Sequence, residues 1–532
     1  MSSLYVAPRR LGAPLSRAFT KNEPRRFISN MLNTPESHHA LMSSPPAAEP
    51  PALSRMPTTT LIRSLLLTSC MSSEWIMRPS LAIMNLIVKS KSPLLNPDKN
   101  PILNKILRWT IYDQFCAGTN RQEVARSVAE FKKFGYQGII LNHAKEIVLS
   151  ADAAKAIEAE GEKQYAPECY EMITKWKEGT LSTLPMLEKG DFLALKLTGA
   201  GPIAVDALRA QKPIPAVIQS ALDEICHATA AQDSHLWIDA EQQVLQPGVD
   251  EWTIALMRKH NAGLSAPLVF NTIQAYLKAS KANTERHIRL AAAEGWALGI
   301  KLVRGAYIEH ETRSLIHDTK EATDAMFDDI ADMLLTKRMP DGCGPDAQFP
   351  AAALFLATHN GPSTMLALET HMKRSRAGLP TARLECGQLV GMADELSCEL
   401  VQNYEKCTRE GTMSAAEVPK AFKYMAWGSV SECLGYLHRR AIENKGAVER
   451  THQMVDALRK ELWRRVNYEK CTREGTMSAA EVPKAFKYMA WGSVSECLGY
   501  LHRRAIENKG AVERTHQMVD ALRRELWRRV VG

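Results

Sequence analysis

Two adjacent arginines, Arg439 and Arg440, stand in a segment whose residue types and spacing suit the binding of a small carboxylic acid. A guanidinium presents a rigid fork of donors that matches a carboxylate. On a helix, Glu443 would share a face with both arginines and hold them in place, and Tyr436 would lie one turn earlier. The segment therefore predicts a carboxylate clamp. The alternative is an ordinary solvated helix face, and the rest of the chain has to decide between them.

The clamp segment occurs twice. Residues 403–466 are repeated as residues 467–530, and the only change is from Lys460 to Arg524. One active site needs one clamp. The connections that lead to the two copies, of about 30 and about 94 residues, differ by roughly 1 kcal/mol in closure entropy, which favours the nearer copy. We therefore expect Arg439 and Arg440 to occupy the site and the second copy to lie outside it.

Polar residues follow a series of short apolar runs, and these runs are the elements that must position them. Amphipathic segments such as 284–296 and 322–335 separate the runs, and this alternation favours a (β/α)8 barrel over an open doubly wound sheet. Residues 198–202 also lack the third glycine of a dinucleotide-binding turn. The predicted fold class is an α/β, TIM-like barrel with strands at 138–141, 192–197, 236–239, 268–273, 299–303, 354–357, 383–388 and 421–425.

In such a barrel the carboxyl ends of the strands form the rim on which chemistry is built. Five consecutive predicted strands end in, or are followed by, polar side chains. These are Lys196, Asp239, Gln274, Arg304 with Tyr307, and Thr358-His359-Asn360.

Composition excludes several classes of protein. The chain of 532 residues has a hydrophobic fraction of 45% and a charged fraction of 24%, which are ordinary for a globular enzyme. The net charge of +8 is dispersed, without a basic stripe interleaved with aromatics, so no nucleic-acid partner is expected. Eleven cysteines without a C-x-x-C motif indicate reduced thiols, with neither a disulfide framework nor a metal site.

The first thirty residues carry six basic side chains against one acid, Glu23, and no long apolar core. This pattern is typical of a mitochondrial transit peptide, with a merely disordered basic tail as the alternative. Pro, Ser and Ala then mark residues 35–57 as a linker. Residues 60–70 and 81–88 are apolar but too short to span a membrane, and a helix that rests on a membrane surface stays possible.

The chain from about residue 101 to 466 resembles the mitochondrial proline dehydrogenase (proline oxidase) family. The resemblance rests on five motifs in order, namely 238–241 (IDAE), 301–307 (KLVRGAY), 357–360 (ATHN), 387–392 (GQLVGM) and 436–444 (YLHRRAIEN). It implies a distorted (β/α)8 barrel that binds FAD, with the eighth helix across the barrel mouth. It also implies oxidation of L-proline to 1-pyrroline-5-carboxylate by hydride transfer to flavin N5. Electrons would pass to ubiquinone, with peripheral contact to the matrix side of the inner mitochondrial membrane.

The resemblance assigns roles residue by residue. The clamp arginines take the proline carboxylate, paired with Glu443 and Glu146. The residues implied at the substrate are Lys196, Asp239, Leu302, Tyr424, Tyr436, Arg439, Arg440, Glu443 and Glu146. The residues implied at FAD are Gln274, Lys301, Val303, Gly305, Ala306, Tyr307, Thr319, Lys320, Thr323, His359 and Glu443.

Composition, the tandem repeat and the resemblance together set the expected organisation. Residues 1–57 form the transit peptide and a disordered linker, 58–130 an N-terminal helical region, 131–466 the barrel, and 467–530 the tandem copy.

Structural alternatives remain for single residues. Lys301 is also compatible with a lysine that reaches from a strand end to solvent, His359 with a structural histidine, and Asp239 with a helix cap. Two rival functions remain as well. One is a barrel flavoenzyme that acts on a related cyclic amino acid such as hydroxyproline, and the other is a non-catalytic interaction protein.

Overall fold

The computed structural model describes residues 50–71, 74–90, 92–144, 165–308, 311–344, 346–411, 413–414, 417–445 and 454–465. Eight parallel strands form its centre: β2 Gly138–His143, β3 Phe192–Leu195, β4 His235–Ile238, β5 Val269–Gln274, β6 Leu298–Val303, β7 Ala352–Ala357, β8 Arg383–Leu389 and β9 Lys420–Trp427. Each strand pairs with the next, and β9 also pairs with β2, so the sheet closes into a barrel. The predicted barrel is confirmed, and all eight predicted strands overlap observed ones.

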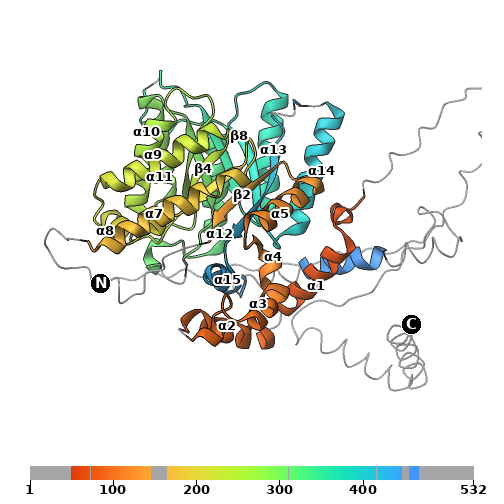
Figure 1. The fold of residues 1–532 in the computed structure, drawn as a ribbon. Coiled ribbons are helices and arrows are strands. Elements are labelled where there is room, and N and C mark those ends of the chain that lie inside the picture. The colour runs from red at the N-terminus through yellow and green to blue at the C-terminus, as the bar shows by residue number, and fades with distance from the viewer. Residues whose placement is uncertain are drawn as a thin grey trace, which may run out of the picture. The chain divides into compact units, whose positions relative to one another are not determined.

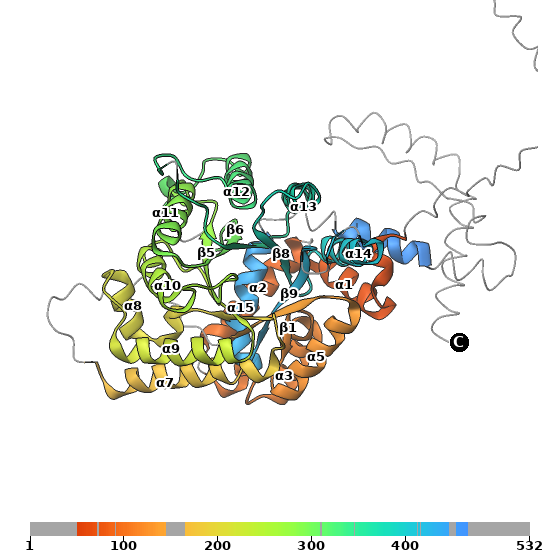
Figure 2. The ribbon, with the colours of Figure 1, turned by 90° about the horizontal axis from the view of Figure 1, so that it is seen from above.

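Helices cover the outside of the barrel (Figures 1 and 2). Capping residues set where these helices begin and end. Asn120 caps α5 by accepting a hydrogen bond from the Glu123 N–H, and Gly135 ends the helix in the left-handed conformation. Thr319 and Asn360 cap α12 and α13 in the same way. The helices are α5 Arg121–Phe134, α7 Pro167–Leu181, α8 Pro202–Arg209, α9 Ala216–Ala231, α10 Gln246–His260, α11 Ser280–Glu294, α12 Lys320–Leu335, α13 Gly361–Arg376, α14 Asp394–Glu410 and α15 Val430–Lys445.

Alternate residues of each strand face opposite sides of the barrel wall. On the outer side, aliphatic residues such as Leu298, Ile300 and Leu302 of β6 join the large core between sheet and helices. On the inner side, aromatic rings fill the barrel, with centroids 4.5 Å apart for Trp237 and Phe355. The interior is therefore a packed core, as is usual for a barrel of eight strands. The inward rings belong to Phe192, Trp237, Phe270, Phe355 and Phe422.

An N-terminal layer of short helices precedes the barrel: η1 Ala52–Arg55, α1 Thr58–Met71, α2 Glu74–Lys89, η2 Pro93–Leu95, α3 Pro101–Leu107, the π-helical η3 Arg108–Tyr112, and α4 Asp113–Phe115. Within the described residues, no helix combines the length and the apolar character that crossing a membrane requires. The strand β1 Cys116–Gly118, which was not predicted, pairs with β9.

The predicted linker ends too late in the chain. Leu53 and Met56 are 4% and 5% exposed and pack with Leu61, Cys398 and Leu458. Hydrophobic burial therefore orders η1 within the segment that was predicted to be a linker up to residue 57. Residues 1–49, which include the predicted transit peptide, lie outside the described residues.

The first copy of the tandem repeat supplies β9 and α15, so it completes the barrel wall between β8 and β2. The second copy, residues 467–530, lies outside the described residues. The helix α15 lies beyond the carboxyl ends of the strands and crosses the end of the barrel when viewed along its axis (Figures 1 and 2).

Candidate active site

A buried ion pair forms the floor of the barrel mouth. The Lys301 Nζ lies 2.5 Å from Asp239 Oδ1, and each residue is only 7% exposed. The same ammonium lies 4.3 Å from the Trp237 ring centroid and 5.8 Å from that of Tyr424. Cation–π attraction adds to the ion pair at such distances. The carboxyl end of β6 thus holds a fixed positive charge beside two aromatic faces.

A second polar cluster joins β3 to the loop after β6. Lys196, the first residue after β3, donates to the Tyr307 hydroxyl at 2.7 Å and to the Ala240 carbonyl at 3.3 Å. The Glu241 carboxylate lies 3.8 Å from the same ammonium and accepts a hydrogen bond from the Thr198 hydroxyl. Contacts between side chains from three strand ends therefore fix Tyr307 at the mouth.

The turn at Gly305 depends on glycine. Its φ is +151°, and an added Cβ would lie 2.3 Å from the Tyr276 ring. Burial, together with the Glu311 carboxylate, raises the pKa of Tyr276 well above its usual value, so its hydroxyl stays protonated and donates to Glu311. Gly305 and Ala306 are exposed, and the Ala306 N–H has a long 3.4 Å bond to Gln274 Oε1. The exposed backbone of this turn leaves room for a ligand to approach closely.

The starts of α12 and α13 meet at Arg304. This guanidinium bonds to Asp324 at 2.7 Å and to the hydroxyls of Thr358 and Ser363 at 2.8 Å. Burial alone would raise the pKa of Asp324, but hydrogen bonds from Lys320 and Arg304 outweigh it and hold that pKa below its usual value. Two helix N-termini and two cations converge here, which favours an anion.

The predicted residues Thr319, Lys320 and Thr323 lie in the first turn of α12. Thr319 caps the helix, and the Thr323 hydroxyl bonds back to the Thr319 carbonyl at 3.3 Å. Lys320 is exposed. These residues face the solvent side of the loop after β6 rather than the barrel interior.

His359 holds the end of a neighbouring strand. Its Nε2 accepts the Leu389 backbone N–H at 3.2 Å, so this nitrogen carries no proton. The contact ties the loop after β7 to the end of β8. His359 therefore has the structural role that was the alternative prediction for it. This role does not exclude a contact with a ligand.

Tyr424 and Tyr436 connect the barrel to α15. Tyr424 packs against both the interior aromatic cluster and the cluster beneath α15, and Tyr436 is a 6% exposed member of the latter. The buried residues of α15 recur at helical spacing, so one face of the helix is fixed. They are Val430, Cys433, Leu434, Tyr436 and Leu437.

For the residues of the clamp, the structure describes the course of the backbone and not the side chains. Positions 439, 440 and 443 continue α15 by one and two turns beyond Tyr436. The side chains of Arg439, Arg440 and Glu443 lie outside the described residues, as does Glu146 altogether.

Leu302 is the predicted site residue that the structure moves away from the others. It is 0% exposed and belongs to the outer, helix-facing core, because it alternates with the inward Lys301 and Val303. The structure therefore does not bring Leu302 together with the other residues implied at the substrate. Sequence reasoning missed Trp237 and Leu389, which share the inward side of their strands with Asp239 and Gly387. Alternation counted from those residues would have found both.

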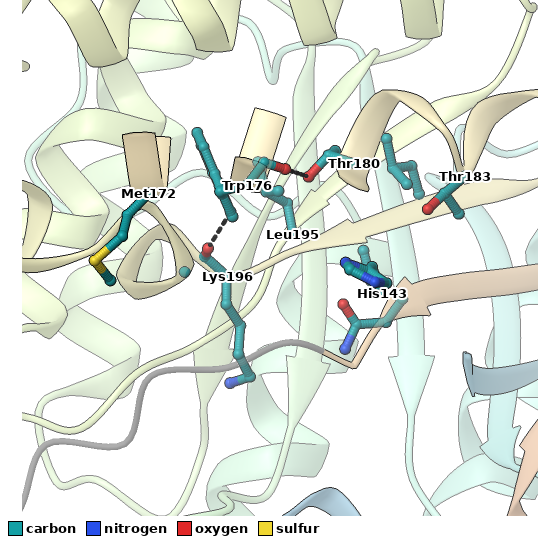
Figure 3. Close-up of a pocket in the computed structure, with 11 residues that line it drawn as sticks. His143, Met172, Trp176, Thr180, Thr183, Leu195 and Lys196 are labelled. Carbon is teal, nitrogen blue, oxygen red and sulfur yellow. Dashed lines mark hydrogen bonds between the residues drawn. The ribbon is translucent and has the colours of Figure 1, made fainter. Parts of the chain in front are cut away.

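A cavity of about 100 Å³ lies beside Lys196, between α7 and the strands β2 and β3. Trp176, His143 and Thr180 line it, and the Trp176 indole donates to the Lys196 carbonyl at 3.1 Å. The Lys196 ammonium points away from the indole (Figure 3). Lys196 lines this cavity and also belongs to the polar cluster at the mouth, so the two share a wall.

Comparisons with known proteins point to one family. A profile of the family described as proline dehydrogenase matches residues 124–453. The probable mitochondrial proline dehydrogenase of Schizosaccharomyces pombe is 28% identical over 453 residues, 76% of this chain and 88% of that protein. The mitochondrial proline dehydrogenase 1 of Homo sapiens is 34% identical over 255 residues, 46% of this chain and 38% of that protein. The hydroxyproline dehydrogenase of Rattus norvegicus is 28% identical over 422 residues, 68% and 83% of the two chains.

A solved structure supports the fold. The crystal structure of proline utilization A (PutA) from Bdellovibrio bacteriovorus aligns with a TM-score of 0.51 and 14% identity. The alignment covers 74% of this chain and 41% of the PutA chain, so this chain spans less than half of that protein.

Proposed function

This chain belongs to the proline dehydrogenase family, and on that premise we propose that it oxidises L-proline to 1-pyrroline-5-carboxylate. The observation that carries the proposal is the buried Lys301–Asp239 pair, set between Trp237 and Tyr424 at the carboxyl end of the barrel. Loss of a hydride from the ring carbon next to nitrogen, and of the amine proton, creates the C=N bond of the product. The mouth has to orient a small zwitterion for that step.

Arg439 and Arg440 bind the proline carboxylate in this proposal, with Glu443 and Glu146 as their anionic partners. The register of α15 supports the assignment, because Tyr436 is buried beneath the helix and positions 439, 440 and 443 follow on adjacent turns. Tyr436, Tyr424 and Leu389 would then bound the apolar ring of the substrate. Fixing the carboxylate at one end orients the ring carbon, and orientation alone can account for a large share of the rate.

The residues at the mouth fit FAD. No side chain accepts a hydride, and FAD supplies that acceptor when bound. The exposed Gly305–Ala306 backbone permits close approach, and Lys301 and Gln274 offer polar contacts to a flavin ring. Arg304 and the starts of α12 and α13 favour the negative charge of a pyrophosphate. The proposed FAD residues further include Val303, Tyr307, Thr319, Lys320, Thr323 and His359.

In this proposal Lys196 and Asp239 position other side chains and do not take part in the hydride transfer itself. Asp239 keeps Lys301 oriented, and Lys196 holds the Tyr307 hydroxyl at 2.7 Å. Electrons leave to ubiquinone, a membrane-soluble acceptor, which requires contact with the matrix side of the inner mitochondrial membrane. The relatives from yeast and human are named mitochondrial, which supports that location.

The experiment compares the two copies of the clamp. Arg439→Met with Arg440→Met removes two charge-assisted contacts and is expected to lower kcat/KM for proline at least about hundredfold. The matched control is Arg503→Met with Arg504→Met, which is expected to leave turnover unchanged. Weak residual activity in the first variant would come from the second copy. Full activity in the first variant would reject the assignment.

Two other functions are separated by simple observations. The rat relative named hydroxyproline dehydrogenase favours hydroxyproline as a second candidate substrate, and dye reduction with each amino acid decides between them. A non-catalytic interaction protein would be purified without flavin absorbance.

A further inference from the structure

The N-terminal helical layer exposes an unusual amount of apolar surface. Half of the exposed large apolar side chains in the described part of the chain come from residues 62–109. The most exposed are Trp109 at 79%, Leu94 at 75% and Ile102 at 73%. Isolated exposed apolar residues need no explanation, but a concentration in one layer marks an interaction surface. The residues are Ile62, Leu66, Ile76, Ile83, Leu86, Val88, Leu94, Ile102, Ile106 and Trp109.

Helical spacing shows that α2 and α3 are apolar on two sides. In α2, Met84 and Ile87 are buried in the cluster beneath α15, whereas Ile83 and Leu86 are 58% and 60% exposed. The inner side therefore already has a partner in α15, and the outer side does not have one among the described residues.

The continuous segment from α3 into η3 repeats this arrangement. Leu107 is buried against α15, while Ile102, Ile106 and Trp109 recur at spacings of four and three. Lys105 is exposed within the same stripe.

The charge of this layer is positive. Lys89, Lys99 and Lys105 are exposed, and among described residues 76–109 the single acidic side chain is Asp98. That carboxylate is engaged by the Ser429 hydroxyl at 2.7 Å and the Ser431 N–H at 3.2 Å. Apolar side chains including an exposed tryptophan, interleaved with lysines, are the composition of helices that lie in the interface of an anionic bilayer.

We propose that the α2–α3 face, defined by Ile83, Leu86, Leu94, Ile102, Ile106 and Trp109, docks this protein on an anionic lipid surface. The inference rests on the proposed function in one respect, because it gives the expected membrane contact a location. Of the elements that carry the face, α2 and η3 pack directly against α15, so docking sets the barrel mouth next to the bilayer. An electron acceptor dissolved in lipid would then be met at the mouth rather than across the molecule.

The test measures binding of the full chain to vesicles. The variant carries Leu86→Ser, Ile102→Ser, Ile106→Ser and Trp109→Ser, all at exposed positions outside the proposed active site. Loss of that much apolar burial is expected to weaken binding to vesicles containing phosphatidylglycerol by roughly a hundredfold or more. The matched control carries Leu264→Ser, Met365→Ser, Leu366→Ser and Leu379→Ser, which are 44–51% exposed elsewhere, and should bind like the unmodified chain.

A second variant isolates the charge. Lys89→Gln, Lys99→Gln and Lys105→Gln should each cost about fivefold on anionic vesicles, with little effect on pure phosphatidylcholine. Equal binding of the serine variant and the unmodified chain would overturn the proposal that the α2–α3 face docks on lipid. Absence of vesicle binding, together with dimers that the serine variant dissociates, would overturn it in favour of self-association.

Proline-dependent reduction of a water-soluble dye separates this inference from the catalytic proposal. All variants should retain it, because none touches the mouth. An unmodified chain that binds vesicles but reduces no dye would defeat the proposed function and leave the docking face standing.

Discussion

Two buried lysine–aspartate pairs lie on opposite sides of the same barrel wall. Lys301 of β6 points inward to Asp239, and Lys423 of β9 points outward to Asp394 at the start of α14. The side chain of Lys423 is 1% exposed, and it also donates to the carbonyls of Met392 and Leu389 at 3.0 and 3.5 Å. Lys423 also lies 5.7 Å from the Tyr136 ring centroid, whereas Lys301 lies near two aromatic faces, those of Trp237 and Tyr424, at the mouth.

Burial and charge therefore do not by themselves mark an active site. Lys423 has three acceptors and anchors the loop between β8 and α14, which is a structural task. Lys301 has the same chemistry on the inward side of a strand end, at the rim where the proposed substrate would bind. The role of a buried lysine in this barrel depends on which side of the wall it faces and on how near it lies to the carboxyl end of its strand.

Replacing each lysine separately should break the symmetry of the two pairs. Lys301→Met is expected to lower kcat/KM for proline by about 10²–10³, because it removes a fixed charge from the mouth. Lys423→Met should leave kcat/KM of the folded enzyme near its original value. Both should lose about 3–5 kcal/mol of unfolding free energy, since each strands a buried carboxylate. Steady-state kinetics with chemical denaturation checks both, and equal kinetic effects would refute the distinction.

The two leucines at strand ends sharpen the same comparison. Leu389→Ala is expected to raise KM for proline about tenfold, because Leu389 follows the inward Gly387 by two residues. Leu302→Ala should cost about 2–5 kcal/mol of stability instead, with unchanged KM, because Leu302 is fully buried in the outer core. A larger change in KM for Leu302→Ala than for Leu389→Ala would restore the original assignment of Leu302.

The smallest expected effect concerns a neutral group on the outer side. Burial lowers the pKa of His287, whose Nδ1–H donates to the Asn283 carbonyl and whose Nε2 accepts from Asn271. The unfolded chain therefore binds a proton first as pH falls through about 6.5, and stability present above that pH is lost below it. We expect a loss of up to about 1.4 kcal/mol per pH unit.

Denaturation of His287→Gln between pH 7 and pH 5 should show a shallower pH slope than the unmodified chain. The matched control is His227→Gln, at an exposed position. An unchanged slope in His287→Gln would show that other groups carry the acid sensitivity.

Much of the barrel could be predicted because its strands are short apolar runs with polar ends. The strand β1 could not, because Cys116–Gly118 is three residues long and its partners, β9 and α5, are set by the tertiary structure. Leu53 and Met56 were missed for a similar reason, since their partners Leu458 and Cys398 are far along the chain. Leu302 was misplaced because a motif identifies a neighbourhood, whereas alternation decides which side each residue faces.

The family resemblance, the order of the strands and the repeat of the clamp segment can all be read from the amino-acid sequence. These depend on local patterns, which period and motif report directly. The pairing of Asp239 with Lys301, the contact of Lys196 with Tyr307 and the place of β9 between β8 and β2 appear only in the folded barrel. Closure of the barrel makes those contacts, because it brings strand ends that are distant in sequence to one rim.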